Sequence, residues 1–284
     1  MWRHFTIVIV CIVSLWSGLV VLLAPAKAAT SSDVPDTSHL EVYAAPPGFR
    51  VQVRDKILYA IPYDSLKTVA MKILQQRTRM NVVILYGVPI RHLTKNDFAL
   101  YQRVCANLHA SVRLLIGDQF SEKPNFDMAG VSIYHRKENL HFDGIGSVTA
   151  SILPQNEQGL AHSFMMLHLE VPNMDVATVL QVPRQSSDPW PREQDVLLLQ
   201  LSKLQGGPQP KVLTILDPKI AVVIDDTARN IANKKVELVE NLYELWADVY
   251  RVEGAGTLTL VAGPHGLMLP IRGKHAHLYG IIVK

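Results

Sequence analysis

Short apolar runs alternate with amphipathic segments between residues 49 and 117, and this alternation constrains the fold more than any other feature. Asp64 is placed to cap a first helix, and the stretch from Thr94 to Asp97 is a capping-box variant, with Asp in place of Glu, that opens a second. The runs that flank these helices have the length and composition of strands, namely FRVQV, KILYAIP, NVVILYG and SVRLLIG. This β-α-β-α-β order predicts an N-terminal α/β or α+β subdomain over residues 49–117.

The middle of the chain, residues 118–210, is predicted to be a β-rich segment. A β-hairpin is expected around residues 137–139, and HSFMMLHLEV at 162–171 has the composition of a further strand. The loop PRQSSDPWPREQ follows at 183–194, where three prolines exclude regular strand pairing. The run DVLLLQL is compatible with either a short helix or a strand before the Gly- and Pro-rich stretch at 206–208.

Residues 211–284 are predicted to form a C-terminal α/β subdomain. KVLTIL at 211–216 and IAVVID at 220–225 are typical of buried strands, and a long amphipathic helix is expected over residues 228–249. The apolar stripe of that helix consists of Ile231, Leu238, Leu242, Leu245, Trp246 and Val249. The runs TLTLVA, LMLPI and HAHLYGIIV then predict an antiparallel meander. The expected fold class is therefore mixed α/β (α+β), with two subdomains and a long C-terminal helix packed on an antiparallel sheet.

The first 28 residues have the pattern of a secretory signal peptide. Arg3 precedes an apolar run from Thr6 to Leu23, and Ala26-Lys27-Ala28 supplies the small-residue cleavage pattern. The run is also long enough to remain as an uncleaved anchor, which would be the only membrane contact that we expect. Residues 29–48 are predicted to be a flexible leader, and the protein is expected in a bacterial periplasm or outside the cell.

Charge and cysteine content narrow the possible functions. Removal of Arg3 and Lys27 with the signal segment lowers the formal net charge from +3 to +1, which does not favour nucleic-acid binding. Cys11 lies in the signal segment, so Cys105 remains alone and the mature chain has no intramolecular disulfide. Because Cys105 falls on the apolar face of a predicted helix, we expect it to be a buried, unreactive side chain.

Histidines at the C-terminal end suggest a metal site. In the stretch RGKHAHLYG, His275 and His277 share one face of a predicted strand, and such a pair can bind one metal ion. In the predicted meander His265 lies at the opposite turn, too far away to be a third ligand. His168 and Glu170 share a face of another predicted strand. A site that uses all four residues, with His168 and Glu170 as catalytic candidates, requires these two strands to be neighbours.

Three stretches resemble parts of known families. The triplets His168-Leu169-Glu170 and His277-Leu278-Tyr279 resemble the paired His-x-Thr/Ser strands of 2H phosphoesterases, although neither triplet carries a hydroxyl of the usual form at its third position. IAVVIDDTARN at 220–230 is similar to a late magnesium-binding motif of haloacid-dehalogenase phosphatases, while Asp225 and Asp226 are equally suited to cap a helix. Residues 60–84 resemble the small N-terminal modules of secretins and TonB-dependent receptors, which implies envelope assembly.

The sequence leaves two functional hypotheses. It contains no glycine-rich dinucleotide motif, P-loop, Gly-x-Ser-x-Gly elbow or His-Glu-x-x-His motif, and it indicates no cofactor. The first hypothesis is a periplasmic protein that binds another envelope protein or a small ligand without catalysis. The alternative is a periplasmic hydrolase, metal-dependent or phosphoester-directed, that uses the strand histidines. Whether the protein is an enzyme stays open at this stage.

Overall fold

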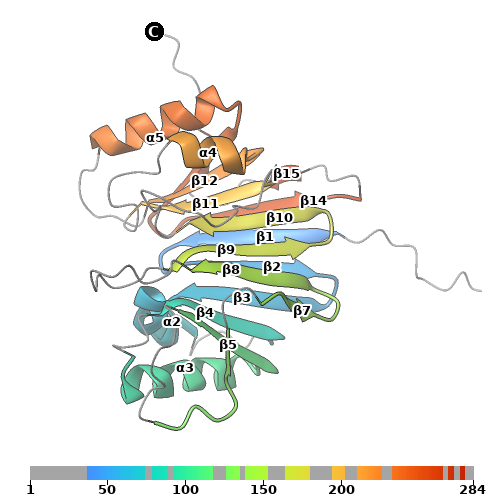
Figure 1. Cartoon of the computed structure of the whole chain (residues 1–284), viewed down its shortest axis with the longest axis vertical. Helices are drawn as coiled ribbons and strands as arrows, with labels where there is room; N and C mark the ends of the chain where they lie inside the picture. The colour runs from blue at the N-terminus through green and yellow to red at the C-terminus, as the bar shows by residue number, and fades with distance from the viewer. Residues whose placement is uncertain are drawn as a thin grey trace, which may run out of the picture. The chain divides into compact units, whose positions relative to one another are not determined.

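The structure is a computed structural model, and eleven stretches of the chain are described: residues 37–73, 79–88, 93–117, 126–134, 138–152, 164–179, 194–201, 210–225, 232–264, 268–271 and 276–278. Residues Asp36–Lys284 form one compact unit. Two mixed β-sheets dominate this unit (Figure 1). None of the helices in the described stretches has the length and apolar character needed to cross a bilayer.

Sheet A joins strands from both ends of the chain. Antiparallel pairing runs through its first five strands and parallel pairing through the rest. The strand order is β15 (Met268–Ile271), β14 (Thr257–Ala262), β1 (Ser38–Ala44), β2 (Pro47–Val53), β3 (Lys56–Pro62), β4 (Val82–Val88), β5 (Val112–Gly117) and β6 (Ser132–Ile133).

Sheet B is parallel in the middle and antiparallel at both edges. Its parallel strands run from β10 to β13, and the strands beyond them pair in the opposite direction. The strand order is β16 (Ala276–Leu278), β13 (Asp248–Glu253), β12 (Ile220–Asp225), β11 (Val196–Gln200), β10 (Met174–Val179), β9 (Phe164–Val171), β8 (Gly146–Ile152) and β7 (Leu140–Phe142).

The core lies between the two sheets. Successive side chains of a strand point to opposite faces, so every second residue of the paired strands reaches the same interior. Leu40, Val42 and Val51 of sheet A belong to one buried cluster with Leu169 and Val176 of sheet B. Burial of this apolar surface is the main contribution to the stability of such a fold.

Helices cover only part of each outer face. On sheet A, the 3₁₀ turn η1 (Tyr63–Ser65) leads into α2 (Leu66–Ile73), which together with α3 (Lys95–Asn107) forms a second buried cluster over β3, β4 and β5. On sheet B, α4 (Pro210–Leu216) and α5 (Ala232–Glu244) form a third over β10 to β13. Figure 1 shows the two helix pairs in different parts of this unit. The outer faces of β14, β1 and β2, and of β8 and the C-terminal part of β9, have no described helix over them.

The N-terminal α/β prediction is confirmed in its element order. Strands β3, β4 and β5 are parallel and connected by α2 and α3. Thr94 caps α3, since its Oγ1 accepts from the backbone N–H of Asp97 at 3.1 Å and donates to Asp97 Oδ2 at 2.7 Å. Cys105 is buried, as expected, and this burial raises the pKa of its thiol to about 11.

The predicted fold class is wrong. The structure is mainly β-sheet, with two sheets around one shared core in place of two subdomains. The long helix expected over 228–249 is described only as the thirteen residues of α5, and it packs on the parallel part of sheet B. Trp246 ends it, because its φ of 61° is left-handed and the Ala247 N–H bonds back to the Leu242 carbonyl at 3.2 Å. The side chain of Trp246 is therefore 94% exposed, not part of an apolar stripe.

Four local predictions also fail. Ser38–Ala44, assigned to a flexible leader, forms the central strand β1. KVLTIL forms α4, because Pro210 suits a first helical position and Leu213 and Leu216 lie three residues apart on its buried face. Instead of a hairpin around 137–139, β6 joins sheet A and β7 joins sheet B. The expected C-terminal meander is likewise divided between the two sheets. β14 pairs with β15 in sheet A, whereas β16 pairs with β13 in sheet B.

Gly146 lies where β8 passes close to β9, and we expect the fold to require glycine there. Its φ is 139°, and a Cβ would meet the carbonyl oxygen of Glu170 at 2.0 Å. Gly254 also has a positive φ, 57°, but a Cβ there meets nothing within 4 Å. Gly146→Ala should therefore lower the free energy of unfolding by roughly 3 kcal/mol, and Gly254→Ala by about 1 kcal/mol. Urea unfolding of both variants tests this, and equal midpoints would contradict it.

Candidate functional site

The structure places His168 and Glu170 far from His277. His168 and Glu170 lie on β9, while His277 lies on β16, opposite Arg251 of β13. Four strands separate β9 from β16 in sheet B, so the two strands are five steps of about 4.8 Å apart, or about 24 Å. The convergence on which a shared site depended is therefore absent. His265 and His275 lie outside the described residues, and a metal site at His275 and His277 stays a prediction.

His168 and Glu170 do share the outer face of sheet B, as the alternation predicted. Glu170 Oε2 accepts a hydrogen bond from Ser147 Oγ at 3.1 Å, and His168 Nδ1 lies 3.3 Å from Thr149 Oγ1, both across the β8–β9 pairing. The Nε2 atom of His168 is buried without a hydrogen-bond partner among the described residues. Burial lowers the pKa of His168, and the nearby Glu170 opposes the shift only in part.

We expect His168 to make the protein less stable in acid. Because its folded-state pKa lies below the ordinary value of 6.5, the unfolded chain binds more protons as the pH falls through that range. This contribution to stability is therefore present at neutral pH, is lost as the pH falls below about 6.5 towards the folded-state pKa, and levels off below it. In His168→Gln that part of the pH dependence should disappear from urea unfolding curves, whereas the exposed His141→Gln should keep it.

A charged cluster lies at the carboxyl edge of the parallel strands of sheet B, where α/β sheets commonly hold ligands. Arg251 Nη2 contacts Asp225 Oδ2 at 2.6 Å and Glu253 Oε2 at 2.7 Å, and the Asp225 side chain is only 4% exposed. Asp225 thus pairs with Arg251. Residues 226–231, including Asp226, lie outside the described part of the chain, so helix capping by Asp226 is not tested. Within the described ranges, no three His, Cys, Asp or Glu side chains gather closely enough to hold a metal ion.

A cavity lies on the outer face of sheet A, beside the uncovered faces of β1 and β2. Its volume is about 230 Å³, and we call it the Arg50 cavity. The lining side chains come from β1, β2, β3, α2, the turn after β1, the start of β14, and the residues just before β4 and after α3, namely Tyr43, Ala45, Pro46, Arg50, Tyr59, Val69, Lys72, Met80, Leu108 and Thr257. The cavity therefore forms where the helical cover of sheet A begins.

The Arg50 cavity is lined by both apolar and cationic side chains. Val69, Met80 and Leu108 are at most 5% exposed, because they belong to the cluster under α2 and α3. Arg50 is partly exposed at 23%, and Lys72 is exposed. Lys72 Nζ donates to the Ala45 carbonyl at 2.6 Å, which holds the ammonium group near the turn and leaves it two further N–H donors.

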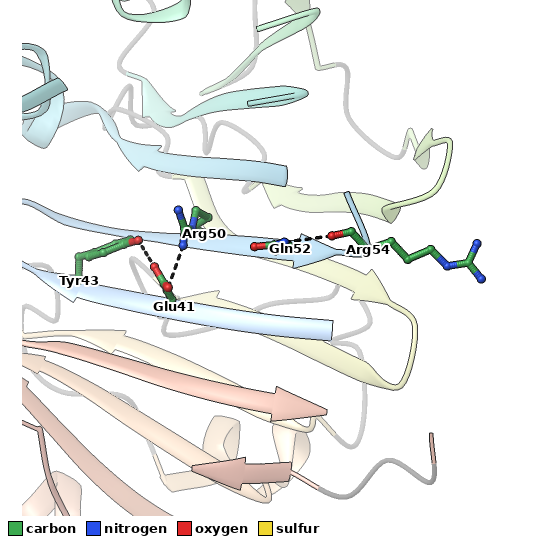
Figure 2. Close-up of polar contacts among 5 residues, drawn as sticks. All are labelled: Glu41, Tyr43, Arg50, Gln52 and Arg54. Atoms are coloured by element: carbon green, nitrogen blue, oxygen red, sulfur yellow. Dashed lines mark hydrogen bonds and ion pairs between the residues drawn. The ribbon is translucent and has the colours of Figure 1, made fainter. Parts of the chain in front are cut away.

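Side chains around the Arg50 cavity form an ion pair and a hydrogen bond with one another. Glu41 Oε1 contacts Arg50 Nη2 at 2.8 Å, and Glu41 Oε2 accepts the hydroxyl hydrogen of Tyr43, so the carboxylate lies between these two side chains (Figure 2). Tyr43 and Tyr59 meet edge to face with ring centroids 6.3 Å apart. Burial raises the pKa of Tyr59 to about 12, so its hydroxyl is a neutral donor at physiological pH. The Tyr59 hydroxyl has no hydrogen-bond partner among the described residues.

The sequence contains only one local signal for this site. The alternation in FRVQV does place Arg50 and Gln52 on the face opposite the buried Phe49 and Val51, which was an available signal. No local pattern indicated that Lys72, from a helix twenty-two residues later, would line the same cavity as Arg50.

Among the solved structures that this chain resembles are two with different descriptions. The β-hydroxylase CmlA, as its E377D mutant, matches with a TM-score of 0.51 and 10% identity over 78% of this chain and 53% of that one. A protein of Parabacteroides distasonis described as a "putative metal-dependent hydrolase" matches with a TM-score of 0.47 and 10% identity over 74% of this chain and 90% of that one. The similarity to CmlA shows a common fold. No protein-family model matches the sequence, and no curated protein matches it.

Proposed function

We propose that this protein binds a small anionic ligand in the Arg50 cavity, as an exported protein of a bacterial cell envelope. One observation carries the binding proposal: two cationic side chains, Arg50 and Lys72, line one cavity together with buried apolar side chains. Ligand sites are typically concave and mostly apolar, with a few convergent polar groups that orient the ligand. The apolar run from Thr6 to Leu23 and the Ala26-Lys27-Ala28 pattern support export.

Charge favours an anion in this cavity. Arg50 and Lys72 are cationic, and Glu41 is the only carboxylate for which a contact with either is recorded in the described part of the chain. One positive charge therefore remains in excess at the cavity. At the carboxyl edge of sheet B, by contrast, Arg251 is shared by two carboxylates, which leaves no excess positive charge for a ligand to neutralise.

Replacement of Arg50 should weaken binding of a small anion. We expect Arg50→Gln to raise the dissociation constant for benzoate about tenfold, since a hydrogen bond to a charged group contributes about 1.5 kcal/mol or more. Arg54→Gln is the matched control, because the exposed Arg54 lies at the end of the same strand and extends away from the cluster in Figure 2. Ligand-observed NMR titration measures both. Equal affinities in the two variants, or no binding to the wild-type chain, would contradict the proposal.

A second candidate is a periplasmic hydrolase that requires a metal ion. The fold shared with the β-hydroxylase CmlA favours an enzyme, and the register of β16 pairs His277 with Arg251 of β13. His275 and His277 would supply the metal ligands in this hypothesis.

Metal content distinguishes this second candidate. Under the hydrolase hypothesis, the full-length chain purified without chelators should carry about one equivalent of a divalent transition metal, and the His275→Ala/His277→Ala double variant should lose it. Elemental analysis of the two proteins, with His141→Ala as a control for an exposed histidine, measures this directly. Equal metal content in the wild type and the double variant would exclude a metal site at these residues.

A further inference from the structure

We infer that the ligand of the Arg50 cavity is a monocarboxylate with a small apolar body, and that Glu41 competes with the ligand's carboxylate for Arg50. This inference rests on the proposed binding function and adds the ligand class and the residue that sets affinity. The geometry behind it is the contact of one internal carboxylate with two side chains that line the cavity, Arg50 and Tyr43.

The ligand class is inferred from the ion pair between Glu41 and Arg50. An arginine guanidinium presents N–H donors in a planar fork that matches a carboxylate. Arg50 holds the carboxylate of Glu41 in this structure, at 2.8 Å, so the same donors are suited to another carboxylate. Because the Glu41–Arg50–Lys72 group carries one excess positive charge, a monoanion neutralises it and a dianion overcompensates.

The apolar body follows from the size and lining of the cavity. A volume of about 230 Å³ is below the range of roughly 300–1,000 Å³ that is usual for drug-sized ligands, and it fits a single ring or a short chain. Three buried lining side chains, Val69, Met80 and Leu108, offer only apolar contact. Tyr59 adds an aromatic ring and a hydroxyl whose hydrogen has no partner among the described residues.

Glu41 acts as an internal competitor because both carboxylates need Arg50. A ligand carboxylate must displace the Glu41 oxygen from the guanidinium or share it, and the two negative charges repel each other at that distance. The Glu41–Arg50 pair is partly exposed, with side chains 29% and 23% accessible, so the exchange is not blocked by deep burial. Partly exposed ion pairs are weak, which keeps the competitor displaceable.

The test is a comparison of wild type with Glu41→Gln in the full-length chain, in mild detergent. Gln keeps the shape and the acceptor for Tyr43 but removes the charge. We expect benzoate and hexanoate to bind Glu41→Gln about fivefold more tightly, a change of about 1 kcal/mol. The neutral analogue benzamide should bind both proteins equally. A residue with a merely structural role would weaken all three ligands together.

The outcomes separate the two proposals. Failure of benzoate, hexanoate and phenyl phosphate to bind either protein would contradict the binding function itself. Binding to wild type without tightening in Glu41→Gln would overturn the competitor role alone. Phenyl phosphate binding more tightly than benzoate would overturn the carboxylate class. Should Glu41→Gln fail to fold by circular dichroism, Glu41→Asp, which withdraws the carboxylate by one methylene, should still tighten benzoate binding about twofold, and unchanged or weaker binding would overturn the inference.

Discussion

Pairing of β1 on both of its edges is the interaction on which the rest of the fold depends. β1 bonds to β2 on one side and to β14, more than two hundred residues later, on the other. Without it, sheet A would separate into an N-terminal half and a C-terminal hairpin. Its inward side chains, Leu40 and Val42, are fully buried in the cluster shared with sheet B. Ser38 Oγ also donates to the Pro172 carbonyl, at 2.5 Å, in the turn between β9 and β10. One strand therefore joins the two ends of the chain and the two sheets.

Helices cover only part of the outer face of sheet A, and the Arg50 cavity lies where this cover ends. Where α2 and α3 lie over sheet A, the outward side chains, such as Ile61 and Leu85, are apolar and buried. Where no described helix lies over it, the outward side chains of β1 and β2 are polar, and Glu41 and Arg50 pair there. The Arg50 cavity is formed at the boundary, so it has buried apolar groups from one region and charged groups from the other. The edge of the helical cover on sheet B likewise explains why His168 is only partly buried. On the same face of β9, Met166 lies in the helix-covered cluster, while Glu170 is exposed.

Local features could be predicted from the sequence, and long-range pairing could not. The Thr94 cap, the existence of β3, α2, β4, α3 and β5 in that order, and the burial of Cys105 each depend on patterns within short stretches of sequence. The pairing of β1 with the distant β14, and of β16 with β13 in the other sheet, has no such local signal. For the sites, strand alternation correctly placed His168 and Glu170 on one face. The sheet order that separates them from His277, and the approach of Lys72 to Arg50, are tertiary facts with no local signal.

Electrostatic balance distinguishes the two charged sites of this fold. Arg251 at the edge of sheet B contacts both Asp225 and Glu253, and Asp225 is almost inaccessible, so an incoming anion would meet two carboxylates and gain little. Arg50 is engaged by one carboxylate that is itself partly exposed, and Lys72 adds a second cation held by a neutral carbonyl. An anion at the first site must break a buried pair, whereas at the second it exchanges with a weak one. Anion binding is therefore favoured at the Arg50 cavity, where the helical cover of sheet A begins. It is disfavoured at the carboxyl edge of sheet B, where the sequence motifs suggested a site.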